Sequence, residues 1–200
     1  MKQINQYIIA LTNLYGQVSP SIVAEIYNSQ NEQKTDSLEV EAQLKEDFSL
    51  HYIYSYEDHF VHESLMGFDD FERIERLREG KPMYVPEKEE LLKYSDMDYF
   101  EEPEQYQKLL DYVETEFIPH HSKEKAEMLC EDFLFTCRFD FETQKAVDFI
   151  HAIGTDFSSN KQLKEVADLV IDLANNVRLW EDYGHTSQEI QNISDNRRRK

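Results

Sequence analysis

Three histidines near residue 55 are the side chains best suited by type to chemistry. His51, His59 and His62 lie close in sequence to Glu57 and Asp58, and zinc sites in hydrolases are built from imidazole and carboxylate ligands. Two histidines three residues apart on a strand point to opposite faces and cannot easily share one ion. The sequence also has no Cys-x-x-Cys, no His-Glu-x-x-His and no glycine-rich phosphate loop. We therefore expect no catalytic residue, no metal and no cofactor, with a metal-dependent hydrolase using these histidines as an alternative.

Carboxylates are the other abundant chemical group. The 200 residues include 41 Asp and Glu against 21 Lys and Arg, a formal net charge of −20 at pH 7. Such a charge repels nucleic acid and anionic membranes and attracts basic protein surfaces. We expect a basic protein surface as the partner, with no direct binding to nucleic acid and none to a membrane.

The elements that would position these groups begin with three helices and a hairpin. Apolar residues at helical spacing from residue 4 to 15 end at Gly16, and a capping Ser19 before Pro20 restarts a helix. A third helix is expected from Ser37 to Asp47, with its apolar side formed by Leu38, Leu44 and Phe48. Alternation over 51–56 and 59–62 predicts an antiparallel hairpin. This order of elements is typical of a winged helix.

In a winged helix the third helix normally reads the major groove of DNA, and here that helix is acidic. Glu39, Glu41, Glu46 and Asp47 lie on it, and Glu57 and Asp58 lie at the turn of the hairpin. Binding to DNA depends on Lys and Arg that displace counterions from phosphates. These six carboxylates are therefore our first candidates for binding a basic partner.

The sequence predicts a mainly α protein in four parts. Residues 1–80 form the acidic winged-helix-like domain, and residues 81–102 form a connector with a short helix. Residues 103–190 form an antiparallel bundle of helices that begin near Pro103 and Ser122, span 141–153, and extend from Ser159 to Tyr183. Residues 191–200 form a polar, basic and disordered tail.

A second group of partner-binding candidates lies at the end of the last long helix. Arg178, the only tryptophan Trp180, and His185 fall within a few residues of one another, and Trp and Arg are enriched at interface hot spots. The alternative, which we favour, is that Trp180 closes the end of the bundle.

Cell location follows from two further observations. The first residues contain no apolar secretion core, and no apolar run approaches the length of a membrane span. Cys130 and Cys137 are seven residues apart in a helical stretch, too far for a disulfide within one helix. We expect a cytoplasmic protein.

Several short motifs resemble a helical region that precedes the zinc-binding SEC-C motif in Firmicutes proteins of unknown function. The matching motifs are Leu11–Gly16, Glu25–Asn31, Phe60–Glu63, Gly80–Pro82, Glu90–Tyr94, Asp172–Trp180 and Gly184–Thr186. The resemblance implies a helical fold but no activity. The cysteine-rich SEC-C motif itself is absent here, so its zinc function does not transfer.

The leading hypothesis is a non-enzymatic, acidic interaction module. Its sharper form is an inhibitor of phage or plasmid anti-defence type that mimics DNA or RNA and occupies the groove of a nucleic-acid-processing protein. A rival hypothesis is a DNA-binding winged-helix regulator that uses the hairpin and the basic tail Arg197–Lys200.

Overall fold

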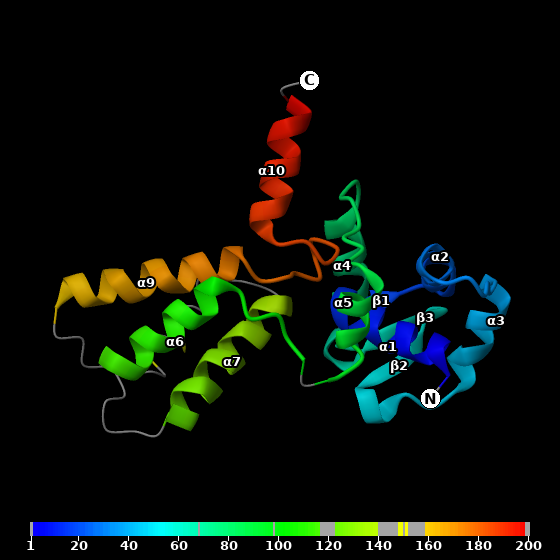
Figure 1. Ribbon diagram of the computed structural model, residues 1–200, viewed down its shortest axis with the longest axis horizontal. Helices are drawn as coiled ribbons and strands as arrows, with labels where there is room; N and C mark the ends of the chain where they lie inside the picture. Colours follow the sequence, from blue (N-terminus) through cyan, green and yellow to red (C-terminus); the bar gives the residue numbers. More distant parts are fainter. Residues whose placement is uncertain are drawn as a thin grey trace. The chain divides into compact units, whose positions relative to one another are not determined.

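A computed structural model describes residues 2–67, 69–97, 99–116, 123–139, 148–149, 151 and 159–198 (Figure 1). The fold is mainly α-helical with one small antiparallel sheet. Two compact units are formed: an N-terminal unit of Met1–Phe100 with Trp180–Gly184, and a C-terminal unit of Glu101–Leu179 with His185–Lys200. This division differs from the expected domains in two ways. Most of the expected connector, residues 81–102, belongs to the N-terminal unit, and so does the segment Trp180–Gly184. No helix within the described ranges is long and apolar enough to cross a membrane.

The first two helices form as expected. Helix α1 spans Gln3–Tyr15 and ends at Gly16, whose φ of 77° lies in the region that favours glycine. Helix α2 spans Pro20–Gln30, and the hydroxyl of Ser19 accepts a hydrogen bond from the amide of Ile22. Between them lies a short strand that the sequence reading missed, β1 (Gln17–Val18).

The third helix is shorter than expected. Helix α3 spans only Ser37–Glu41 and continues as the 3₁₀ segment η1 (Ala42–Lys45). Its buried residue is Val40, whereas Leu38 is 72% exposed, so the expected apolar side of this helix was wrong at Leu38. One turn of α-helix cannot hold a full apolar stripe, and the next contacts come from the residues after η1, including the buried Phe48.

The hairpin is confirmed and belongs to a three-stranded sheet. Strand β2 (Ile53–Tyr56) pairs with β3 (His59–His62), and β3 pairs on its other side with β1, in the order β1-β3-β2. Glu57 and Asp58 turn the hairpin with φ values of 45° and 58°. The short segment η2 (Ser49–His51) precedes the hairpin and η3 (Glu63–Leu65) follows it. A strand between the first two helices, paired with the returning strand of the hairpin, completes the winged-helix-like arrangement.

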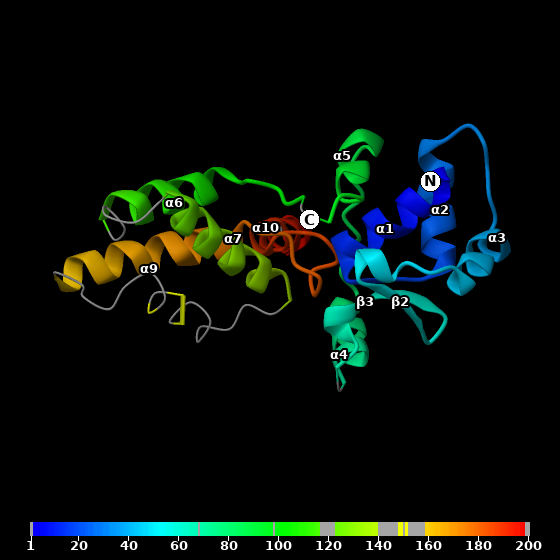
Figure 2. The same ribbon diagram turned by 90° about the horizontal axis from the view of Figure 1, so that it is seen from below.

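Two short helices complete the N-terminal unit. Helix α4 spans Asp70–Arg78 and helix α5 spans Lys88–Lys93 (Figure 2). The main apolar cluster of this unit draws its buried side chains from residues between Tyr7 and Tyr94. Helix α1 lies at its centre, with Tyr7, Ile8 and Leu11 fully buried.

The C-terminal unit is built on three helices that pack against one another. They are α6 (Glu104–Glu116), α7 (Lys123–Phe139) and α9 (Asn160–Asn175). The helix expected over 141–153 lies largely outside the described residues. Helix α9 begins at the Ser159 cap as expected but ends at Asn175, so its expected extension to Tyr183 was wrong. Residues 178 and 186 instead form an antiparallel β-bridge.

The tail is helical where it is described, which corrects the expectation of disorder from residue 191. Helix α10 spans Ser187–Arg198. At its start the Thr186 hydroxyl accepts from the Glu189 amide, and the Glu189 carboxylate accepts from the Thr186 amide. This reciprocal pair is a capping box, and Arg197 and Arg198 in the last turn favour the negative end of the helix.

Candidate interaction surface

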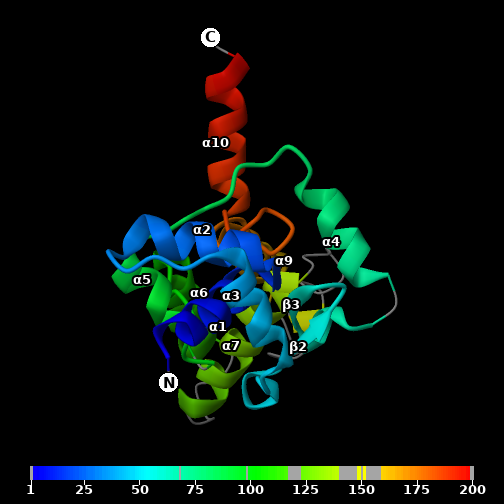
Figure 3. The ribbon, with the colours of Figure 1, turned by 90° about the vertical axis from the view of Figure 1, so that its right-hand side faces the viewer.

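The exposed surface formed by residues 36–58 is here called the wing face. It holds the six carboxylates predicted as partner-binding residues, and all six are exposed: Glu39, Glu41, Glu46, Asp47, Glu57 and Asp58. Helix α3 packs on α2, and η1 and η2 contact β2, so the third helix and the hairpin form one continuous part of the unit (Figure 3). Only some of these acids lie on regular helix, because Glu46 and Asp47 follow η1 in extended chain.

Local hydrogen bonds hold the acidic segment in shape. The Asp36 carboxylate accepts from the Glu39 amide at 2.8 Å and caps the start of α3. The Glu39 carboxylate accepts from the Thr35 hydroxyl at 2.7 Å. Asp47 accepts from the Ser49 amide at 2.9 Å, and hydrogen bonds from Ser49 lower the pKa of Asp47. Asp47 is therefore ionised at neutral pH.

The charge on the wing face has no internal compensation. From Asp36 to Asp58 the chain carries seven carboxylates and a single cation, Lys45. Among the described residues, none of the six candidate carboxylates lies in an ion pair. Repulsion between like charges disfavours the folded state, so this surface carries an electrostatic cost that a basic partner would relieve.

Apolar and aromatic side chains lie among these acids, and the sequence reading missed them. Leu50 is 85% exposed and Tyr52 is 49% exposed, while Tyr54 and Tyr56 are each 39% exposed. Tyr54 and Tyr56 are two residues apart on β2 and therefore share one face of the strand. The alternation over 51–56 was the available signal, since one face of an antiparallel sheet is commonly solvated. Tyrosine is enriched at protein interfaces, so these exposed side chains make the wing face a candidate for contact with a partner.

The hairpin histidines serve the fold. The Nδ1 atom of His59 lies 2.7 Å from the carbonyl oxygen of Glu57, and the His59 ring packs edge-on against Phe71. The Nδ1 atom of His62 accepts from the Ser64 amide at 3.2 Å. Across the described ranges, no group of three or more His, Cys, Asp or Glu is arranged to hold a metal ion.

Trp180 is a buried residue of the N-terminal unit. This corrects both predictions made for it, that it binds a partner and that it closes the end of the bundle. It is 2% exposed, and its indole N–H donates to the carbonyl oxygen of Asn13 at 3.0 Å. It therefore neither closes the helical bundle nor offers a surface anchor to a partner. The sequence could not show this, because the contact joins residues 167 positions apart.

Arg178 and His185 belong to an ionic cluster in the C-terminal unit. Arg178 donates to Glu101 at 2.9 Å and to Glu189 at 2.9 Å, and His185 Nδ1 lies 3.0 Å from Glu189. Burial raises the pKa of Glu189, but Arg178, the Thr186 amide and His185 together bring it below its ordinary value. The side chains of Arg178 and His185 are only 14% and 12% exposed, so the structure gives them internal partners rather than the surface role predicted.

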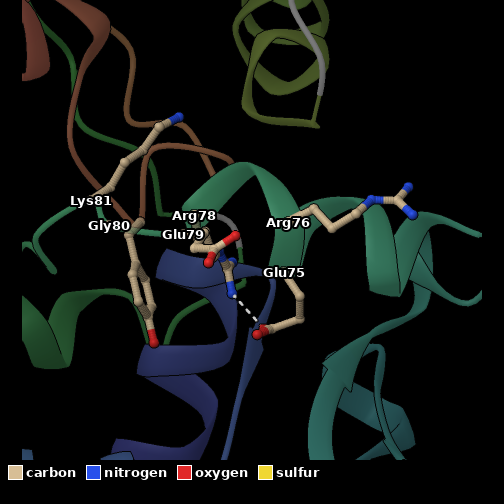
Figure 4. A pocket seen from close by; sticks show the side chains of 7 residues that line it. Glu75, Arg76, Arg78, Glu79, Gly80 and Lys81 are labelled. Atoms are coloured by element: carbon tan, nitrogen blue, oxygen red, sulfur yellow. Dashed lines mark ion pairs between the residues drawn. The ribbon is translucent and has the colours of Figure 1, made fainter.

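A shallow pocket of about 500 Å³ lies at the end of α4, lined by Glu75, Arg76, Tyr183 and residues 78–81. Arg78 is 5% exposed, and burial lowers its pKa to about 10, so it stays charged at neutral pH. Its guanidinium faces Glu75 at 3.6 Å (Figure 4) and stacks on the Tyr183 ring at 4.7 Å. The cations here are largely committed to the protein itself.

Comparison with known families, characterised proteins and solved structures finds no match to this chain.

Proposed function

We propose that this protein is a non-enzymatic interaction module whose wing face binds a basic protein surface. The observation that carries the proposal is the position of the unpaired acids. Glu39, Glu41 and the residues around them occupy the place where a winged helix presents its recognition helix, and Glu57 and Asp58 occupy the tip of the wing. Winged helices turn their recognition helix toward phosphate, whereas most of the charged residues in this segment are acidic.

The exposed tyrosines narrow the partner to one that offers more than charge. Tyr54 and Tyr56 are each 39% exposed near the acids, and an arginine can stack on an aromatic ring while it pairs with a carboxylate. Arginine makes such contacts more often than lysine and adds a planar, bidentate pairing with carboxylate. The proposed partner surface is therefore rich in arginine.

The narrower form of the proposal is a nucleic-acid mimic that inhibits a nucleic-acid-processing protein. The exposed acids at Glu39, Glu46 and Asp47 support it through their sign and location. Because α3 ends at Glu41, these acids do not form a row along one regular helix. The broader proposal of a basic protein partner does not depend on such a row.

The test is a pair of binding titrations by fluorescence anisotropy, one with labelled oligoarginine and one with a labelled DNA duplex. We expect saturable binding of oligoarginine that weakens as salt is raised, because the contact is between charges screened over about 10 Å at 0.1 M salt. We expect no change in the anisotropy of the labelled duplex at physiological salt. Binding of the duplex with no binding of oligoarginine would overturn the proposal and favour the DNA-binding regulator.

A further inference from the structure

The segment Trp180–Gly184 belongs to the N-terminal unit although the residues on both sides of it belong to the C-terminal unit. At its base, the Leu179 amide donates to the carbonyl oxygen of His185 at 3.0 Å. This hydrogen bond closes a five-residue loop, Trp180–Gly184. We propose that the N-terminal unit contains a peptide-binding site and that Trp180–Gly184 is its ligand, bound in cis and able to be replaced by a peptide of the same sequence.

The first element of this site is a pocket for one tryptophan. The Trp180 ring is buried, and its single N–H donor is satisfied by Asn13. A Cβ atom at Gly16 would lie 2.5 Å from the indole ring, so only glycine leaves room for it. The His62 ring packs against the indole at 5.1 Å between centroids. An aromatic anchor in a shaped pocket is the usual centre of an interface hot spot.

The second element holds the segment by its backbone and its acids. Arg78 Nε donates to the carbonyl oxygen of Trp180 at 2.8 Å. Lys81 Nζ donates to the carbonyl oxygen of Glu181 at 2.9 Å and to the carboxylate of Asp182 at 2.7 Å. The site therefore binds both the backbone of the segment and the carboxylate of the residue two positions after the tryptophan.

The third element is a main-chain hydrogen bond to a turn, followed by a glycine. The Tyr84 amide donates to the carbonyl oxygen of Tyr183 at 3.1 Å, and Tyr183 itself lies in a turn, with a φ of 55° and its amide donating to the carbonyl oxygen of Trp180 at 3.2 Å. The Tyr183 ring packs edge-on against Tyr15 at 5.2 Å. A Cβ atom at Gly184 would lie 2.9 Å from the Tyr15 ring, so glycine is also needed at the last position. The ligand chemistry is thus a tryptophan, a residue held by its backbone carbonyl, an acid, a tyrosine and a glycine, in that order.

Part of the site is supported by the N-terminal unit without the segment. The buried side chains of one apolar cluster of this unit come from residues between Tyr7 and Tyr94, and the partly buried Tyr183 packs against that cluster. Arg78 also donates to the carbonyl oxygen of Gln17, which belongs to the unit itself. Its Nη2 atom has no hydrogen-bond partner among the described residues. The receptor side therefore has its own support for the residues that bind the loop.

The experiment replaces the loop in the full chain and returns it as a peptide. The variant carries Trp180→Gly, Glu181→Ser, Asp182→Gly and Tyr183→Ser, which removes the only tryptophan. The probe is a synthetic peptide with the sequence of residues 178–186, so all indole fluorescence comes from the peptide. We expect a saturable blue shift of that fluorescence and a rise in the Tm of the variant, as for any ligand that binds the folded state.

Two controls separate specific binding from simple adhesion. Wild-type protein should take up a dye-labelled form of the peptide at least about tenfold more weakly than the variant does, because its own loop competes at a high effective concentration. In the variant, Lys81→Met and replacement of the peptide's aspartate by asparagine should each weaken binding. The two changes together should weaken it by less than the sum of both, because they remove the same contact.

Each result of the loop replacement either supports or contradicts a peptide-binding site in the N-terminal unit. A variant that keeps its helical circular dichroism but shows no blue shift contradicts it. A variant that unfolds and is not refolded by the peptide also contradicts it, because the segment would then be an inseparable part of the core. A variant that is unfolded alone and folds with the peptide supports it.

Discussion

Carboxylates are dense in both units but are used differently in the two. In the C-terminal unit, lysines pair with acids along the same helix, as in Lys108–Glu104 and Lys161–Glu165. On the wing face of the N-terminal unit, the six candidate acids have no such partner within the described chain. The net charge of −20 therefore does not describe a uniform coat of solvating groups.

This difference between paired and unpaired acids indicates which acidic surface is available to a partner. A carboxylate paired three or four residues away gives a few tenths of a kcal/mol to its own helix, roughly 0.2–0.5 kcal/mol per pair. A carboxylate without such a partner gains no ion-pair stabilisation. The wing face is thus the region where we propose that the acids serve binding.

The largest loss of stability should come from a change in Trp180–Gly184, the late segment that belongs to the N-terminal unit. Trp180→Ala removes a buried indole and its hydrogen bond to Asn13, and we expect it to lower the free energy of unfolding by about 3–5 kcal/mol. Urea denaturation followed by tyrosine fluorescence and circular dichroism measures this. Tyr54→Ala on the wing face is the matched control and should cost less than about 1 kcal/mol. Equal losses would mean that Trp180 is not the buried anchor described.

The next effect comes from two glycines with the same backbone angle. Gly16 and Gly80 have φ values of 77° and 76°, but a Cβ at Gly16 would meet Trp180 whereas a Cβ at Gly80 meets nothing within 4 Å. Gly80→Ala should cost about 1–2 kcal/mol from the backbone alone. Gly16→Ala should cost that amount plus about 1–3 kcal/mol for overpacking. Chemical denaturation of both variants tests the difference, and a smaller loss at Gly16 would contradict the packing.

A smaller effect should appear in the ionic cluster of the C-terminal unit. Glu189→Gln weakens the contacts to Arg178 and His185, and we expect a loss of about 1 kcal/mol, reduced because the carboxylate is 39% exposed. Because folding lowers the pKa of Glu189, its contribution is complete above the ordinary carboxyl pKa of about 4.3 and is lost as pH falls through the folded value.

Thermal unfolding of wild type and Glu189→Gln across this pH range provides the measurement. The difference in Tm should be present at pH 7 and should shrink on acidification. A difference that stays constant down to low pH would show that the charge of Glu189 is not what stabilises the cluster.

The smallest effect should have opposite signs in the two regions. Glu104→Gln removes the exposed pair with Lys108 and should lower stability slightly. Glu41→Gln removes one like charge from the wing face and should leave stability unchanged or slightly raised. Both effects should fade at high salt because exposed charges are screened. A loss of stability in Glu41→Gln equal to that in Glu104→Gln would remove the contrast between the regions.

Local signals in the sequence predicted local structure well. Gly16, the Ser19–Pro20 pair and the alternation at 59–62 determine a helix end, a helix start and a hairpin, and each depends on residues a few positions apart. The third helix was overestimated because the acidic run from Ser37 has helical propensity, while only Val40 provides a buried contact on α3. Propensity without packing does not extend a helix.

Long-range contacts decided what the sequence could not show. The six acids of the wing face could be named because exposure of charge is the rule. The role of Trp180 could not, because Asn13, Gly16 and Arg78 surround it only in the folded chain. The tail forms a helix that begins with a capping box at Thr186 and Glu189, a Thr-x-x-Glu pattern that the sequence does contain.

The most direct test of the central claim compares two variants with the same net charge. One replaces Glu39, Glu41, Glu46 and Asp47 by their amides, and the other makes the same type of change at Glu104, Glu116, Glu124 and Asp132 in the C-terminal unit. Binding of labelled oligoarginine is measured for both by fluorescence anisotropy at physiological salt. We predict that the wing-face variant loses at least about tenfold in affinity, or roughly 1.4 kcal/mol, while the other stays within about twofold of wild type. Equal losses would show that binding follows total charge, and the wing face would then have no special role.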